Sequence, residues 1–327
     1  MASALLATGC GHRPSTVPSR AVSTCHYVID ARRMPALVLD VTARCRGARV
    51  VGFALSRTEL VDAVRMISAS APLERRGTHF VVSPPRPQLV ARYRVELERL
   101  VRTHPELGVR AGSSLLAPAS SFLVHPLPLD VGTEVTVEAS GSLPFTTALE
   151  RRDEQYRIAA HEIPVASYAA FGRFTTTILE LPSDHRLELV LLDGPGPTPA
   201  HVRDWAERSA RAVAAFYGRF PVPRATVFVV PVPGKAGVLD GVLLPESAPG
   251  ITVHVGADSR AADFEADWIL IHELFHLGVP SFHAEGRWFD EGLAVYFGAL
   301  LRARAGLLDE RALWEEFVRE MPAGLAN

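Results

Sequence analysis

The hydrophobic pattern of this chain changes its period near residue 195. Before that point, short runs alternate apolar and polar residues, as in Leu37-Val38-Leu39-Asp40-Val41, and turn residues separate the runs. Alternation with a period of two is typical of half-buried β-strands. We therefore predict an all-β, sandwich-like domain over residues 25–194. Its strand-like runs lie at 37–41, 93–97 and 135–137, around Ile178, and at 187–192.

A rigid break, Asp193-Gly194-Pro195-Gly196-Pro197, separates this region from a helical pattern. Thr198 can cap a helix that has Pro199 in its first position, and Gly218 can end it. The break therefore predicts a domain boundary. The apolar stripe of the helix consists of Val202, Trp205, Val213 and Phe216.

Strands and helices then mix over residues 195–327, which predicts an α+β domain. Two strand-like runs, Thr226 to Val230 and Ile251 to Val255, precede a helix that Asp258 or Ser259 can cap and Gly278 can stop. Further helices are predicted over 290–304 and 309–321. The apolar stripes are Phe264, Trp268, Ile271 and Phe275 in the first of these helices, and Leu313, Trp314, Phe317 and Met321 in the last.

Composition agrees with a soluble globular protein. Apolar residues make up 48% of the chain and charged residues 21%, and the formal net charge is −2. No long run of like charge occurs, so the sequence argues against nucleic acid or a polybasic membrane surface as a partner.

The segment His272-Glu273-Leu274-Phe275-His276 carries the clearest chemistry. Residues four apart lie on one face of a helix, so His272 and His276 can bind one metal ion, with Glu273 beside it. A catalytic zinc takes three protein ligands and leaves one position for water, and Glu291 on the next helix can be the third ligand. Glu273, free of the metal, is then the general base that takes a proton from the activated water.

The competing interpretation is two ordinary histidines on an amphipathic helix, with Glu291 as an acidic residue in the first turn of the next helix. It does not explain why a strongly apolar helix carries His272, Glu273 and His276 together, because buried polar and charged groups need a partner or a metal.

These residues also carry a resemblance. His-Glu-Leu-Phe-His at 272–276, followed by Trp-Phe-Asp-Glu-Gly-Leu-Ala-Val-Tyr at 288–296, resembles the gluzincin zinc metallopeptidases with a thermolysin-like catalytic domain. The closest resemblance is to the glycyl aminopeptidase family, with the alanyl aminopeptidases as cousins. It implies one Zn²⁺ per chain, a β-sandwich-like N-terminal domain, a thermolysin-like domain over 195–327 and a C-terminal helical part that is truncated here.

The resemblance further implies a substrate site. In the family, an acidic residue in a Gly-Gly-Leu-Glu-His loop holds the free amine of the substrate, and the matching stretch here is Gly237-Val238-Leu239-Asp240-Gly241. Asp240 is the candidate amine anchor, although Asp-Gly is also a strong turn signal that needs no ligand. Family members pair the peptide with an edge strand, and our candidate is Ile251 to Val255. Tyr296, close to Glu291, is assigned to core packing instead of catalysis.

Three functions therefore compete for a peptide or protein substrate. The first is a zinc aminopeptidase at the cell envelope. The second is a zinc endopeptidase on the same scaffold, which the altered loop at Asp240 permits. The third is a zinc-bearing but inactive peptide-binding protein.

The N-terminus predicts the location. Ala4-Leu5-Leu6-Ala7-Thr8-Gly9-Cys10 resembles the end of a bacterial lipoprotein signal with Cys10 as the lipidated residue, and residues 1–24 then form signal and tether, unless they are a disordered leader. A periplasm-facing lipoprotein would touch the membrane only through this lipid. Cys25 and Cys45 are then an even pair for which a disulfide is permitted.

Overall fold

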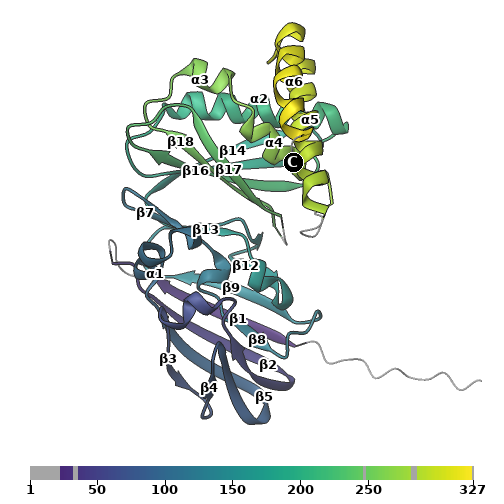
Figure 1. The fold of residues 1–327 in the computed structure, drawn as a ribbon. Coiled ribbons are helices and arrows are strands. Elements are labelled where there is room, and N and C mark those ends of the chain that lie inside the picture. The colour runs from purple at the N-terminus through teal and green to yellow at the C-terminus, as the bar shows by residue number, and fades with distance from the viewer. Residues whose placement is uncertain (1–22, 32–35, 246–247, 281–285, 326–327) are drawn as a thin grey trace, which may run out of the picture.

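The computed structural model describes residues 23–31, 36–245, 248–280 and 286–325. Over these residues it contains β-sheets of nine, four and five strands. Figure 1 shows the nine-stranded sheet at the bottom, the four-stranded sheet above it, and the five-stranded sheet with its helices at the top. Cys10 lies outside the described residues.

The nine-stranded sheet is exposed on one face and packs on a core with the other. Its main path runs β11-β12-β9-β1-β2-β5-β3, with β8 paired to β2 and β4 to β5. Alternate residues of β1 are buried, as a period of two requires for such a sheet. The strands are β1 Thr24–Ala31, β2 Leu39–Ala54, β3 Val64–Ala69, β4 Glu74–Arg76, β5 His79–Val95, β8 His125–Leu127, β9 Glu134–Ser140, β11 Glu150–Arg152 and β12 Gln155–Ala159.

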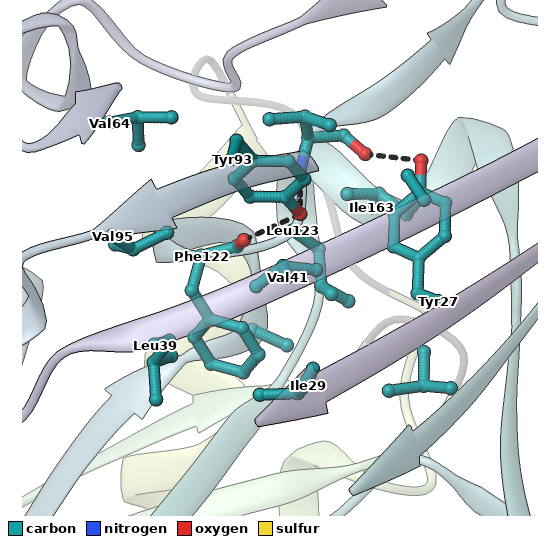
Figure 2. Packing of buried hydrophobic residues seen from close by; sticks show 14 of the residues in the cluster. Tyr27, Ile29, Leu39, Val41, Val64, Tyr93, Val95, Phe122, Leu123 and Ile163 are labelled. Carbon is teal, nitrogen blue, oxygen red and sulfur yellow. Dashed lines mark hydrogen bonds between the residues drawn. The ribbon is translucent and has the colours of Figure 1, made fainter. Parts of the chain in front are cut away.

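Two buried tyrosines in this core form hydrogen bonds with the backbone of residues 122–124 (Figure 2). The Tyr27 hydroxyl donates to the Val124 carbonyl at 2.7 Å, and the Tyr93 hydroxyl donates to the Phe122 carbonyl at 3.0 Å. Cys25 and Cys45, directly opposite each other on β1 and β2, form a disulfide. The pairing that the sequence permits is therefore present in the structure.

The four-stranded sheet, of order β10-β13-β7-β6, contributes to the same core, where Phe171 packs edge-on against Phe122. Its strands are β6 Val109–Ala111, β7 Ser114–Pro118, β10 Phe145–Thr147 and β13 Tyr168–Gly172. The short helices of this half are η1 Thr58–Val61, α1 Leu97–Thr103, η2 Pro105–Leu107, η3 Ala119–Ser121 and η4 Ala160–Val165.

The five-stranded sheet has the order β14-β15-β16-β18-β17. Its first two strands lie before residue 194, where the sequence pattern places them in the N-terminal β domain. They instead join the later sheet, because β15 pairs in parallel with β16 across the predicted break. The strands are β14 Phe174–Leu181, β15 His185–Leu192, β16 Arg224–Val232, β17 Val238–Leu244 and β18 Gly250–Gly256.

Helices cover one face of this sheet (Figure 1). α2 Pro199–Tyr217 has Pro199 in its first position and ends at Gly218, which has a left-handed φ of 78°, so both predicted ends are confirmed. The Thr198 side chain makes no capping hydrogen bond. The single helix expected from residue 258 is two helices, α3 Ala261–Glu265 and α4 Ile269–His276. Asp267 causes the break because its carboxylate accepts hydrogen bonds from the amides of Ile269 and Leu270 and so starts a new helix.

The last two helices are α5 Arg287–Arg304 and α6 Glu310–Leu325, close to the predicted ranges. Two expected core positions differ, since Trp268 is 48% exposed and Trp314 is 59% exposed. Trp268 precedes α4 instead of lying within its buried stripe. No helix within the described ranges is both long and apolar enough to cross a membrane.

Candidate metal centre and cleft

Helix α4 has one face toward the sheet and the other toward α5. Leu270, Leu274 and Phe275 are buried in the core that α2 and the sheet share, which fixes the rotation of the helix. His272 and His276 are consequently turned to the side where α5 supplies Glu291. The i, i+4 spacing read from the sequence thus has the predicted effect.

Three side-chain atoms converge at this point. His272 Nε2 lies 3.1 Å from Glu291 Oε2 and 3.2 Å from His276 Nε2, and the third distance, from His276 Nε2 to Glu291 Oε2, is 3.6 Å. Among the residues that the structure describes, these three form a group able to hold a metal ion.

The spacing fits zinc. Zinc binds histidine nitrogen and carboxylate oxygen at about 2.0–2.2 Å in a tetrahedron, whose corners are then roughly 3.3 Å apart. The three observed distances, 3.1, 3.2 and 3.6 Å, match the edges of one tetrahedral face. Two imidazoles and one carboxylate are also the donor set of a catalytic zinc that keeps a fourth position open.

Two further residues, which the sequence did not single out as supports, hold the ligands. Asp290 Oδ1 lies 3.1 Å from His276 Nδ1, so it can fix the tautomer that leaves Nε2 free for a metal. Arg287 Nε lies 3.5 Å from Glu291 Oε1, the oxygen that faces away from the imidazoles. The available signal was position, because Asp290 directly precedes Glu291 and Arg287 lies one helical turn before it.

The electrostatics favour the protonation states that metal ligands need. Burial, and then the neighbouring His276, lower the pKa of His272, which keeps its imidazole neutral. Burial of Glu291 acts to raise its pKa, but the two histidines and hydrogen bonds from His272 and Arg287 outweigh it and lower the pKa. Glu291 is therefore ionised and His272 unprotonated near neutral pH.

Glu273 lies in a different environment from the ligands. Only 9% of the residue is exposed, and burial raises its pKa to about 7, although His276 and a backbone hydrogen bond from Leu243 act in the opposite direction. A carboxyl group that titrates near 7 suits a general base or acid. Gly241 makes room for it, because a Cβ at that position would lie 2.8 Å from Glu273 Cγ.

A cleft of about 870 Å³ opens beside these residues. One wall is β17, an edge strand whose partner among the described strands is β18. The edge strand expected at Ile251 to Val255 is instead an inner strand, because β17, which includes the stretch that the resemblance matches to a loop, covers it. The lining residues are Gly241, Val242, Leu243, Pro245, Glu273, His276, Arg287, Trp288, Asp290 and Glu291.

Asp240 does not line this cleft. It pairs with His254 across β17 and β18, with 2.5 Å between Asp240 Oδ1 and His254 Nδ1, and its side chain is 59% exposed. Successive strand residues point to opposite faces, so Gly241 meets α4 while Asp240 points to the other face. The structure thus joins His272, Glu273, His276 and Glu291 and leaves Asp240 apart from them.

Tyr296 also differs from its sequence assignment. It is 45% exposed on α5 and stacks on Phe317 of α6, with ring centroids 5.3 Å apart. It packs between two surface helices and not in the core.

Comparison with known proteins finds no family model and no curated protein that matches this chain. Solved structures of M1 zinc metallopeptidases share its fold. The aminopeptidase N family protein from Idiomarina loihiensis has a TM-score of 0.66 at 12% identity, over 88% of this chain and 56% of that one. A variant of a two-domain M1 zinc metallopeptidase, bound to L-arginine, has a TM-score of 0.54 at 16% identity, over 91% and 74%.

The M1 zinc metallopeptidase from Deinococcus radiodurans has a TM-score of 0.50 at 16% identity, over 92% of this chain and 74% of that one. This chain spans 56% of the length of the Idiomarina protein. The similarities establish a fold like that of the M1 zinc metallopeptidases, and at these identities they do not distinguish the glycyl aminopeptidase family from its relatives.

Proposed function

We propose that this protein is a zinc-dependent metallopeptidase of the M1-like gluzincins, with His272, His276 and Glu291 as ligands of one zinc and Glu273 as general base. The observation that carries the proposal is the convergence of three ligand atoms at tetrahedral spacing beside a buried carboxyl group. These groups line a cleft bounded by an edge strand, where an extended peptide can add as a further strand.

The residues of the chain divide the work of peptide hydrolysis. A zinc ion bound here would supply a Lewis acid that polarises the scissile carbonyl and makes water nucleophilic near neutral pH. Glu273, buried beside the ligands, accepts the proton of the attacking water and returns it to the leaving amine. The backbone of β17 orients the peptide, and Asp290 and Arg287 keep His276 and Glu291 in place.

The finer proposal is an aminopeptidase. The Idiomarina neighbour is described as an aminopeptidase N family protein, and the Deinococcus enzyme has been crystallised with a Tyr-Ser-Ala substrate. The placement of Asp240 favours the second candidate, a zinc endopeptidase, because Asp240 points away from the cleft and cannot cap a substrate amine in this position.

The central test compares four forms of the purified chain. Wild type should hold one zinc per chain, and Glu291→Ala should lose it. Glu273→Gln should retain zinc but lose about 100- to 10,000-fold in kcat, since removing a base removes rate and not metal affinity. The exposed Glu265 of α3 gives the matched control, Glu265→Gln, which should change neither zinc content nor kcat.

The outcomes separate the candidates. Zinc binding without hydrolysis of any peptide in a mixed library would support the inactive peptide-binding protein instead. Zinc retained by Glu291→Ala would refute the assignment of the third ligand.

Cleavage of one peptide is measured with its amine free and again with its amine acetylated, which distinguishes an aminopeptidase from an endopeptidase. An aminopeptidase cleaves the first residue from the free peptide only, whereas an endopeptidase cleaves both internally.

The location stays a proposal as well. We propose that the chain is a periplasm-facing lipoprotein anchored through Cys10, and Cys10→Ala should release it from the membrane fraction. Mass spectrometry that finds an unmodified N-terminus upstream of Cys10 on membrane-bound protein would exclude the anchor.

A further inference from the structure

The exposed face of the nine-stranded sheet carries arginines on two central strands. In β2, Ala43 and Cys45 are buried while Arg44 and Arg46 are exposed. In β5, the buried residues are Leu89, Ala91 and Tyr93, and the exposed residues between and after them include Arg92 and Arg94. The alternation of the strands therefore directs all four arginines to the solvent side.

Strand pairing brings these arginines together. Arg92 on β5 lies opposite Thr42 on β2. Arg44 and Arg46 follow Thr42 on the same face of β2, two and four residues further along. Directly opposite residues of an antiparallel pair are about 5 Å apart and diagonal ones about 7–8 Å. On β3, Arg65 lies opposite Arg94 and extends the group toward that edge. We call Arg44, Arg46, Arg65 and Arg92 the arginine face.

Three acidic groups of this side face other partners than the arginine face. Asp40 accepts from Arg94 at 2.8 Å, Glu134 lies 3.0 Å from Arg157, and Glu138 lies 3.5 Å from His26. A fourth, Asp30, lies opposite Asp40. Within the part of the chain that the structure describes, no member of the arginine face has an ion pair. Four exposed guanidinium groups therefore have no ion-pair partner among the described residues, in a chain whose net charge is −2.

From this arrangement we infer that the arginine face binds the surface of an anionic phospholipid bilayer. Guanidinium groups bind phosphate oxygens bidentately, and clustered arginines are drawn to anionic headgroups. The start of the described chain lies at the same place, because β1 begins at Thr24, directly opposite Arg46. A membrane anchor at Cys10 would enter the fold beside the arginine face and hold it against the bilayer.

Other anionic partners fit this surface less well. Binding of single-stranded nucleic acid depends on aromatic side chains on which bases stack. Of the neighbouring outward positions Thr24, His26, Thr42 and Gln88, His26 alone is aromatic, and it is half-buried with its ring held 2.9 Å from the Thr136 hydroxyl. The arginine face spans β2, β3 and β5, and Figure 1 shows these strands in the half of the molecule opposite to α4 and α5. A bilayer can therefore occupy it without covering the cleft.

The test uses the full chain carrying Cys10→Ala, so that no acyl chain contributes. Its co-sedimentation with phosphatidylcholine vesicles is compared with that on vesicles that also contain phosphatidylglycerol. We expect binding only to the anionic vesicles. It should weaken strongly between about 0.1 M and about 1 M salt, because the screening length falls from about 10 Å to about 3 Å.

Variants locate the surface. Each arginine near an anionic bilayer contributes about fivefold to partitioning, so Arg44→Gln alone should lose about fivefold, and the triple variant Arg44→Gln, Arg46→Gln, Arg92→Gln about a hundredfold. The matched control replaces three exposed arginines of the other half and should bind as wild type. These control positions are Arg208, Arg219 and Arg260.

Three results would overturn the inference: equal binding to neutral and anionic vesicles, equal losses in the triple variant and its control, or binding to duplex DNA without binding to anionic vesicles. Circular dichroism of all variants checks that none has unfolded. If the triple variant has unfolded, the comparison of Arg44→Gln with wild type is used instead.

Discussion

Two buried tyrosines of the β half and two buried side chains at the candidate metal centre hold their polar groups in different ways. In the β half, the hydroxyls of Tyr27 and Tyr93 donate to backbone carbonyls at 2.7 and 3.0 Å. Burial raises the pKa of both phenols, so they stay neutral. In the other half, His272 Nδ1 is buried and has no hydrogen-bond partner within the described chain, and burial raises the pKa of Glu273 to about 7.

The difference separates stability from chemistry. The tyrosine hydrogen bonds join fixed backbone groups and leave each hydroxyl satisfied, so they stabilise one arrangement. His272 remains able to bind a metal ion and Glu273 to bind a proton, and both groups lower the stability of the metal-free protein. Substitutions should therefore cost stability in the first group and chemistry in the second.

Tyr93→Ala should show the largest effect on stability. It removes a ring that is 1% exposed and leaves the Phe122 carbonyl without its donor. We expect a loss of about 3–5 kcal/mol in the free energy of unfolding, measured by urea denaturation. Tyr296→Ala, at a ring that is 45% exposed, is the comparison and should lose much less. If Tyr93→Ala and Tyr296→Ala lost the same free energy of unfolding, the contrast between the two groups would be wrong.

Glu273→Gln should change stability in the opposite direction in the metal-free protein. Because the folded-state pKa of Glu273, about 7, lies above its ordinary value of 4.5, its contribution to stability is complete below pH 4.5 and is lost as the pH rises through 7. Glutamine does not titrate. The variant should thus gain on wild type by up to roughly 3 kcal/mol between about pH 4 and about pH 8.

Thermal unfolding of both proteins across this range, with a chelator present, measures the gain. A stability difference between the two proteins that stays constant from about pH 4 to about pH 8 would show that burial of Glu273 does not disfavour its ionised form.

Asp240→Asn should have the smallest effect. Asp240 is 59% exposed in its pair with His254, so the variant should lose no more than about 1 kcal/mol of stability. Its position outside the cleft also predicts an unchanged Michaelis constant for a peptide with a free amine. A rise for that peptide, but not for its acetylated form, would restore Asp240 as the amine anchor.

The sequence by itself determined the local features of the site. His272 and His276 share a helix face because the helical repeat places residues four apart together, whatever surrounds the helix. The ends of α2 followed from Thr198, Pro199 and Gly218, whose backbone preferences act within one turn. Alternation also placed Leu39 and Val41 on a buried face, whereas Ile178 is 53% exposed.

Only the tertiary structure decided which elements meet. The sequence pattern placed β14 and β15 in the N-terminal domain, but β15 pairs with β16 of the later sheet. β17 includes the stretch that the resemblance matches to a loop, and it becomes the edge strand. Asp290 gained its role from its distance to His276, and the arginine face arose from the pairing of β2 with β5. A period reveals only the face on which a side chain lies, because its neighbour across that face comes from distant sequence and is selected by packing.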